Sequence, residues 1–289
     1  MKYKSITAIL FSCIVLFGCK NNVSWEEELE LKLNSLADSL VTNLNEWEVP
    51  EHNLKVEDFG AIADGKTINT HAIQKAIDKC AEEGGGQVLF SKGDYVTGTV
   101  ILKSNVMLQI DKGARIIGSI KISDYPHKIE TFKSIMSERY EFKQSLIFAE
   151  KQENVGICGE GEIYFRGEIE HFPGPETILK IVDRPLGIRM IQCKNVVVKD
   201  ILLRNSAAWM QNYLNCENLI FDGIKVINLA NYNNDGLDID GCRNVIVRKC
   251  NIISGDDAMC LKGASSRVSE NILIENCSFL TNCNGLKIG

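Results

Sequence analysis

Apolar and polar positions recur in a fixed order through the C-terminal third of the chain. Four segments begin with an asparagine, continue with three apolar residues, and place a charged residue at the fourth position after it. Successive asparagines are 23, 26 and 27 residues apart, and they are Asn195, Asn218, Asn244 and Asn271. The apolar runs are short, rich in β-branched residues and bounded by turn residues, which is typical of strands. A repeat of this length predicts that each segment is one coil of a stacked solenoid.

The repeats share one direction, so equivalent strands of successive coils should pair in parallel. We therefore predict an all-β fold, a right-handed parallel β-helix, with the four asparagines stacked as a ladder at one turn. Cys193, Cys216 and Cys242 each lie two residues before a ladder asparagine and should form a second stack. Coils ~4.8 Å apart permit disulfides between stacked cysteines, but packed free thiols are the preferred interpretation.

A helical pattern precedes the regular repeats. Its apolar face is expected to consist of Ala72, Ile73, Ala76, Ile77 and Cys80, and Gly84 to Gly86 should end it. Because a solenoid needs its open end covered, we interpret this helix as a short N-terminal cap. At the other end the sequence stops inside a coil, at Gly289. We therefore expect the chain to be C-terminally truncated, part of a longer protein.

The first 52 residues are expected to lie outside the β-helix, which we assign to 53–289. Residues 1–19 combine basic Lys2 and Lys4 with an apolar run too short to span a bilayer, the pattern of a signal peptide. The ending "LFGC" resembles a bacterial lipobox, which implies that Cys19 is lipidated; an ordinary cleaved signal is the alternative. Residues 20–52 then predict a helical spacer, or a helix docked on the domain. We expect an exported, outer-membrane-anchored lipoprotein facing the periplasm or the cell surface.

Composition excludes some classes of function. The chain is 45% hydrophobic and 24% charged, which is ordinary for a globular protein. Its net charge of −6, without a basic stripe, argues against a nucleic-acid partner. The cysteines lack the paired spacing of a zinc site, so we expect neither a metal nor a cofactor. We expect a monomer.

The candidate chemistry is a group of carboxylates. Each coil continues to a further strand, and aligning these strands places Ala208, Asp235, Asp257 and Asn284 in one column, with Asp256 beside Asp257. Asp235, Asp256 and Asp257 should therefore converge on one face, although a solvated turn is the simpler reading of two adjacent acids. Like charges this close raise at least one pKa, as a general acid requires, and leave another carboxylate as a base.

Calcium is the main competing use of clustered carboxylates. Asp238 and Asp240 follow Asp235 on the same strand and point to one face by alternation. For this second pair, structural calcium and outward solvation are both reasonable interpretations.

At these residues the chain resembles glycoside hydrolase family 28, the polygalacturonase family. The resemblance extends from about Val56 to the C-terminus, and it is carried by "NND" at 233–235, "GDD" at 255–257, "FGAIADGKTINTHAIQKAID" and "RPLGIRMIQCKNVVVKDILLRNSAAWMQ". It implies hydrolysis of α-linked galacturonic acid-containing pectic polysaccharides or oligogalacturonides with inversion. Asp256 would be the general acid, and Asp235 and Asp257 would hold and deprotonate the water. Inversion requires carboxyls ~6.5–9.5 Å apart.

The resemblance also implies substrate-binding positions, which we assign to Asn284, Lys262, Lys287 and Trp209. Lys262 would meet a uronate carboxylate, Lys287 would supply positive charge or lie on the outer face, and Trp209 would be a sugar platform or a core residue. Asn284 stands where the family carries the histidine of a GHG motif, and the family's RIK motif would lie beyond Gly289.

These departures leave the linkage and the endo or exo mode open. Two other classes also remain. A polysaccharide lyase on the same fold would need calcium and a basic residue at the site. A non-catalytic glycan-binding or adhesive β-helix has its best support in the missing histidine.

Overall fold

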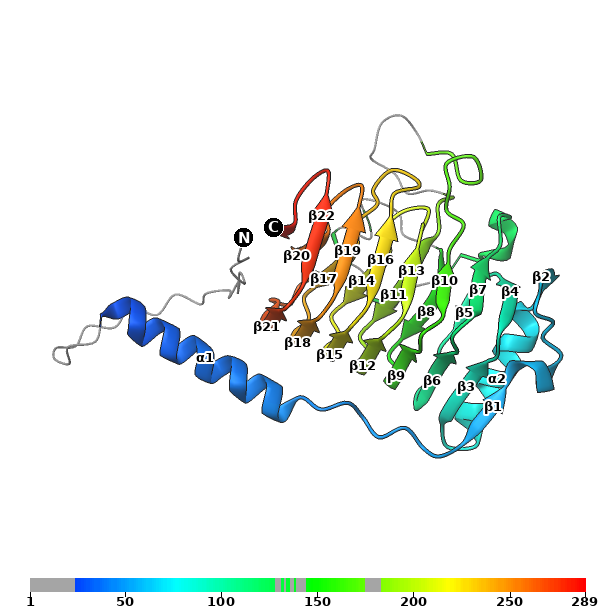
Figure 1. Cartoon of the computed structure of the whole chain (residues 1–289), viewed down its shortest axis with the longest axis horizontal. Helices are drawn as coiled ribbons and strands as arrows, with labels where there is room; N and C mark the ends of the chain where they lie inside the picture. The colour runs from blue at the N-terminus through cyan, green and yellow to red at the C-terminus, as the bar shows by residue number, and fades with distance from the viewer. Residues whose placement is uncertain (1–23, 128–130, 133, 136–137, 139–143, 175–182) are drawn as a thin grey trace.

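The computed structural model describes residues 24–127, 131–132, 134–135, 138, 144–174 and 183–289, and these form a parallel β-helix (Figure 1). Three parallel sheets run along the solenoid, and each coil after the first contributes a strand to each of them in turn. The predicted fold class is confirmed. The proposed signal peptide, including Cys19, lies outside the described residues.

Sheet A carries the asparagine repeat at its strand starts. In spatial order its strands are β1 (Asn53–Lys55), β3 (Gly86–Phe90), β6 (Val106–Ile110), β9 (Glu153–Cys158), β12 (Lys194–Lys199), β15 (Glu217–Asp222), β18 (Arg243–Arg248) and β21 (Glu270–Glu275).

Sheet B follows sheet A within each coil. Its strands are β2 (Asp64–Ile68), β4 (Gly93–Thr97), β7 (Ala114–Gly118), β10 (Glu162–Tyr164), β13 (Leu202–Arg204), β16 (Lys225–Asn228), β19 (Asn251–Ser254) and β22 (Ser278–Thr281).

Sheet C completes each coil and carries the site. Its strands are β5 (Val100–Ile101), β8 (Ser145–Glu150), β11 (Leu186–Ile191), β14 (Gln211–Leu214), β17 (Leu237–Asp240), β20 (Met259–Lys262) and β23 (Leu286–Ile288).

An asparagine ladder sets the turn into sheet A. Each ladder side chain donates its amide N–H to the side-chain oxygen of the asparagine one coil earlier, over 2.7 to 3.1 Å, along Asn105, Asn154, Asn195, Asn218, Asn244 and Asn271. All six have φ between 53° and 63°, the left-handed region that asparagine tolerates better than most residues. The predicted ladder of four is confirmed, and it begins two coils earlier, where the flanking sequence no longer matches the repeat.

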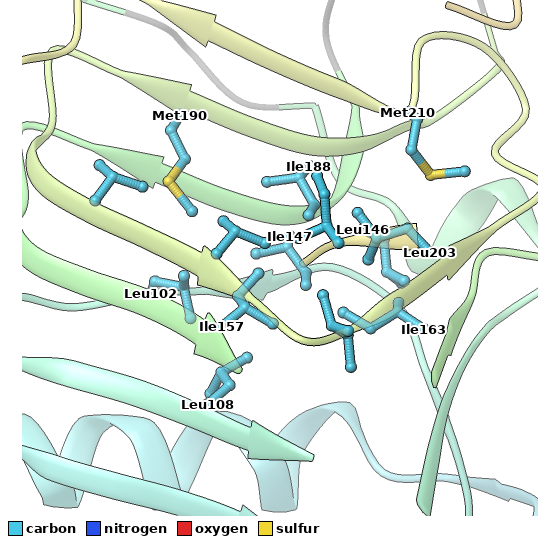
Figure 2. Close-up of a cluster of buried hydrophobic side chains, with 14 of the residues drawn as sticks. Leu102, Leu108, Leu146, Ile147, Ile157, Ile163, Ile188, Met190, Leu203 and Met210 are labelled. Carbon is cyan, nitrogen blue, oxygen red and sulfur yellow. The ribbon is translucent and has the colours of Figure 1, made fainter. Parts of the chain in front are cut away.

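The core fills the inside of the coil. Figure 2 shows aliphatic side chains from successive coils meeting there, among them Leu108, Ile157, Ile188 and Leu203. The stacked Cys193, Cys216 and Cys242 are fully buried free thiols. Small apolar thiols therefore serve as packing groups in this core.

Helix α2 (Thr70–Glu82) closes the N-terminal end of the coil, as predicted. It buries Ile73, Ala76, Ile77 and Cys80 against the first strands. Gly85 follows the helix at φ 105°, and a Cβ there would lie 2.3 Å from the carbonyl oxygen of Asn105, so only glycine fits. Two 3₁₀ turns, η1 (Val56–Phe59) and η2 (Ile122–Asp124), lie near the same end of the coil.

Helix α1 (Trp25–Asn43) and the chain after it lie along the outer face of sheet A (Figure 1). Leu44 is buried on an outward apolar stripe of sheet A, against which Ala37, Leu40, Trp47 and Val49 also pack; the stripe consists of Met107, Cys158, Val197, Ile220, Ile246 and Leu273. An ion pair joins Lys199 to Glu46. These contacts favour a docked segment over a free spacer. No helix within the described residues is long and apolar enough to cross a bilayer.

Candidate active site

The acidic residues lie on turns stacked directly above one another, between sheets B and C. Backbone hydrogen bonds of 2.9 Å run from Gly236 N–H to the carbonyl of Asp257, and from Ala258 N–H to the carbonyl of Asn284. Asp235, Asp257 and Asn284 therefore occupy one column on three successive coils, as the alignment predicted.

One member of the predicted column was wrong. Met210 N–H donates to the carbonyl of Asp235, and β14 pairs Asn212 with Asp238, so Trp209 is level with Asp235 and Ala208 is not. The sequence alignment began that strand one residue too early. The corrected register places an indole ring under the acidic column.

Asp257 is buried and held as a carboxylate. The Asn284 amide donates to its Oδ1 at 2.6 Å, and Lys287 Nζ lies 2.9 Å from its Oδ2. Burial acts to raise the pKa of Asp257, but the hydrogen bonds from Asn284 and Lys287 outweigh burial and lower it. Asp257 is therefore ionised at neutral pH, the state that a base requires.

Asp256 shares the turn with Asp257 but is only half buried. Its backbone carbonyl accepts hydrogen bonds from the hydroxyls of Ser254, at 2.7 Å, and of Thr281 on the next coil. Its Oδ1 accepts from the backbone N–H of Asp257 at 3.0 Å. The carboxyl group is thus fixed in direction while it keeps access to solvent.

Asp235 is 3% exposed and lies in a buried charge cluster with Asp238, Lys262 and Trp209. Lys262 Nζ is 2.9 Å from Asp238 Oδ1, 3.4 Å from Asp235 Oδ2, and 4.1 Å from the centre of the Trp209 ring. Burial, with a further contribution from Asp238, raises the pKa of Asp235, while Lys262 opposes that rise. One of the clustered acids thus has a raised pKa, but burial is the first cause, and the acid is Asp235, which was predicted to activate water and not to be the general acid.

Asp238 and Asp240 are buried, so outward solvation of this pair was wrong. Burial raises the pKa of Asp238 to about 6 against the opposing charge of Lys262. Asp240 accepts hydrogen bonds from the backbone N–H groups of Ala264 and Ser265, at 3.1 and 2.8 Å. Both carboxyls are therefore used by protein groups.

The four substrate-binding assignments remain predictions, and the geometry distinguishes among them. Lys287 is half exposed and Asn284 is exposed, and both contact Asp257. Lys262 is 5% exposed with its ammonium between two carboxylates, and Trp209 is 3% exposed. The core alternative for Trp209 is the one that its burial favours.

Two residues at the site had been missed. Arg184 is buried, and its guanidinium donates to the carbonyl of Tyr232 at 2.9 Å and to Asn233 Oδ1 at 2.8 Å. It thereby fixes the loop that leads to Asp235. An arginine directly before a proline, in a segment quoted for its family resemblance, was the available signal. Cys283 is exposed, and its thiol groups with the carboxylates of Asp256 and Asp257 within 4.8 Å.

The group of Asp256, Asp257 and Cys283 tests whether the clustered acids could bind calcium. Calcium takes six to eight oxygen ligands, whereas this cluster offers two carboxylates and a thiol, with the Lys287 ammonium already on Asp257. The donor set does not fit calcium.

Known proteins with similar sequences agree with the family resemblance of the acidic motifs. The chain is 30% identical over 223 residues to a Vitis vinifera protein named "Probable polygalacturonase", covering 73% of this chain and 44% of the relative. It is 23% identical over 249 residues to the exo-poly-alpha-D-galacturonosidase of Dickeya chrysanthemi, covering 71% and 41%. The chain thus spans less than half the length of these relatives.

Solved structures agree on the fold. The exopolygalacturonase of Thermotoga maritima superposes with a TM-score of 0.76 at 23% identity, over 89% of this chain and 66% of the other. The polygalacturonase of Erwinia carotovora superposes with a TM-score of 0.64 at 20% identity, over 85% and 70%. The model of "Glycosyl hydrolases family 28" matches residues 80–289, which contain every residue of the site described above. The chain belongs to glycosyl hydrolases family 28.

Proposed function

We propose that this protein hydrolyses α-linked galacturonic acid-containing pectic chains, as polysaccharides or oligosaccharides, with inversion at the anomeric carbon. The observation that carries the proposal is the stack of Asp235 and Asp257 on adjacent coils with Asp256 beside them. Family membership and the names of the relatives support the substrate class.

Asp256 is the proposed general acid, since its carboxyl is held by the turn yet reaches solvent. It protonates the glycosidic oxygen as the bond to the anomeric carbon breaks. Asp257, ionised through Asn284 and Lys287, and Asp235 hold the water on the opposite side of the sugar, and one of them takes its proton as the new C–O bond forms. Asp256 loses one proton to the leaving oxygen and the base gains one proton from water, so the number of protons on the enzyme is unchanged.

Lys287 is the proposed contact for the uronate carboxylate, because it is the half-exposed cation at the column. Its ammonium is bonded to one oxygen of Asp257 and retains donors for a second anion. A neutral sugar would not use this charge, so the site should prefer galacturonate to galactose.

The geometry disfavours a lyase. A lyase base must be unprotonated, but the pKa of Lys262 is raised: burial lowers it, and Asp238 and Asp235 more than reverse that effect. Lys287 also has a raised pKa, chiefly through its hydrogen bond to Asp257. Both lysines at the column are therefore protonated.

The test uses polygalacturonate, oligogalacturonides and rhamnogalacturonan, with reducing ends and unsaturated products measured in parallel. We expect new reducing ends without ultraviolet-absorbing products, insensitive to chelator. Unsaturated products that disappear with chelator would indicate a lyase instead. Glycan binding without product from any substrate would indicate a binding protein.

We propose further that the protein is exported and anchored by a lipid on Cys19 in the outer membrane. The basic, apolar and "LFGC" order of residues 1–19 supports this. Radiolabelled palmitate should enter the protein in a bacterial host and be lost in Cys19→Ala, whereas equal labelling of both would contradict the anchor.

A further inference from the structure

We propose that Lys262 is a positioning residue for Asp235, holding this water-binding carboxyl in place and favouring its charged form, and that it does not contact the substrate. This inference rests on the proposed function, because it gives Asp235 its role there. It differs from the family-based expectation that the lysine after the acidic pair meets a uronate.

The first argument is geometric. Lys262 lies at the end of β20, and its side chain contacts three groups from two earlier coils: Asp235, Asp238 and Trp209. An ammonium carries three N–H donors and no acceptor. With Asp238 at 2.9 Å, Asp235 at 3.4 Å and the Trp209 ring at 4.1 Å, all sides of the ammonium that face the protein are occupied.

The second argument is burial. Lys262 and Asp238 are 5% and 0% exposed, so this ion pair is buried together with Asp235, which is 3% exposed. The Trp209 face beneath the ammonium adds a cation–π contact, which is strongest when the cation is desolvated. A buried lysine with two carboxylates is a fixed local charge, unlike the half-exposed Lys287.

The third argument is charge. The charged groups that face Asp235 among the described residues are Lys262 from β20, Asp238 from its own strand, and Asp256 and Asp257 from the next turn; Arg184 contacts the preceding loop. Lys262 is the one cation of this set that faces the carboxyl itself. Without it, burial and three acids would all act against ionisation.

The direct test is Lys262→Met, which keeps an unbranched side chain one heavy atom shorter and removes the charge. We expect kcat to fall about 100-fold, as for loss of a well-placed base, with KM changed by less than about twofold. The acid limb of the kcat/KM profile should move upward by about one pH unit, because losing a cation raises the pKa of Asp235. Lys262→Arg should recover part of kcat. A rise in KM with kcat retained would overturn the proposal in favour of a uronate contact.

A matched control and a second variant guard against a merely structural effect. Lys194→Met removes a lysine paired with Glu153 at 3.5 Å on sheet A and should leave kcat, KM and the pH profile unchanged.

Lys262→Met combined with Asp238→Asn removes the buried pair together, which usually costs less stability than leaving one charge unpaired. If the lysine serves Asp235, this double variant stays impaired. Recovery to near wild-type kcat would show that Lys262 only neutralises Asp238, and would overturn the proposal.

A carboxyl titration by ¹³C NMR separates this inference from the proposed function. The Asp235 resonance, assigned with Asp235→Asn, should titrate at a higher pH in Lys262→Met than in the wild type. An unchanged Asp235 titration would refute the role of Lys262, even for an enzyme active on pectate. Absence of activity on every galacturonide would refute the proposed function and leave the titration result standing.

Discussion

At the scale of residues, the three neighbouring carboxylates of the site have different surroundings. Asp257 accepts hydrogen bonds from the Asn284 amide and the Lys287 ammonium. Asp235 is buried beside Lys262, and Asp256 keeps contact with solvent. Divergent environments of this kind are how enzymes separate the roles of chemically identical groups.

Replacing the proposed acid should abolish turnover. In Asp256→Asn we expect kcat to fall at least about 1000-fold, because an amide cannot protonate the glycosidic oxygen. Reducing-end release measures the loss. Asp58→Asn, in η1 at the far end of the coil, is the matched control and should retain full activity. Activity of Asp256→Asn within tenfold of the wild type would remove Asp256 from the mechanism.

The charge on Lys287 should be visible in the pH profile. Because Lys287 lowers the pKa of Asp257, Lys287→Met should raise that pKa and move the acid limb of kcat/KM to higher pH. KM for oligogalacturonides should rise as well if the ammonium also meets the uronate. Steady-state kinetics across pH separates the two effects, and an unmoved limb would mean that the acid limb reports Asp235 and not Asp257.

Residue-level prediction from sequence succeeded where a repeat fixed the position. Asp235, Asp257 and Asn284 follow from counting between coils, since parallel stacking converts sequence spacing into adjacency. Counting did not reveal that Lys262 and Trp209 are buried, because solvent exposure on the outer face of sheet C depends on segments far away in the sequence. Arg184 was missed for a similar reason: its partners at 231–233 lie almost 50 residues later.

At the scale of elements, the asparagine ladder stabilises the turn that leads each coil into sheet A. Each rung requires both a left-handed backbone and a side-chain amide, and asparagine supplies both. The sequence showed the ladder only where the apolar triplets around it are regular. Asn105 and Asn154 belong to coils whose lengths differ, so spacing alone did not align them.

Two substitutions at Asn218 should separate the two contributions. Asn218→Gly keeps the backbone conformation and loses the amide, which should lower the free energy of unfolding by about 1–2 kcal/mol. Asn218→Ala should cost about 1 kcal/mol more, because alanine at φ 59° is strained. Urea denaturation of the two variants measures the difference, and equal midpoints would show that the backbone conformation carries no cost here.

At the scale of the whole molecule, the outer face of sheet A is covered by the chain's own N-terminal segment. The sequence predicted a helical spacer or a docked helix within 20–52, but it could not show what the helix contacts. The apolar stripe of sheet A consists of one outward residue per coil, from Met107 to Leu273. In the sequence these residues stand between core residues of the same apolar run, so their outward direction is not apparent.

Docking of this segment can be tested at Leu44, which is its buried anchor. Leu44→Asp should release the segment, because a carboxylate would be buried without a partner on the apolar stripe of sheet A. Limited proteolysis should then cut between residues 24 and 49 faster than in the wild type, while the coil survives. Val41→Asp, on the exposed side of α1, is the control. Equal cleavage rates in all three proteins would favour a free spacer.

The measurement that tests the central claim most directly is the anomeric configuration of the first product. ¹H NMR of a trigalacturonate digest, recorded before mutarotation, distinguishes the two anomers of the new reducing end. If Asp256 protonates the leaving oxygen while Asp235 and Asp257 direct water to the opposite side, the β-anomer accumulates first. Initial accumulation of the α-anomer would mean retention through a covalent intermediate, and it would contradict the roles assigned to these three carboxylates.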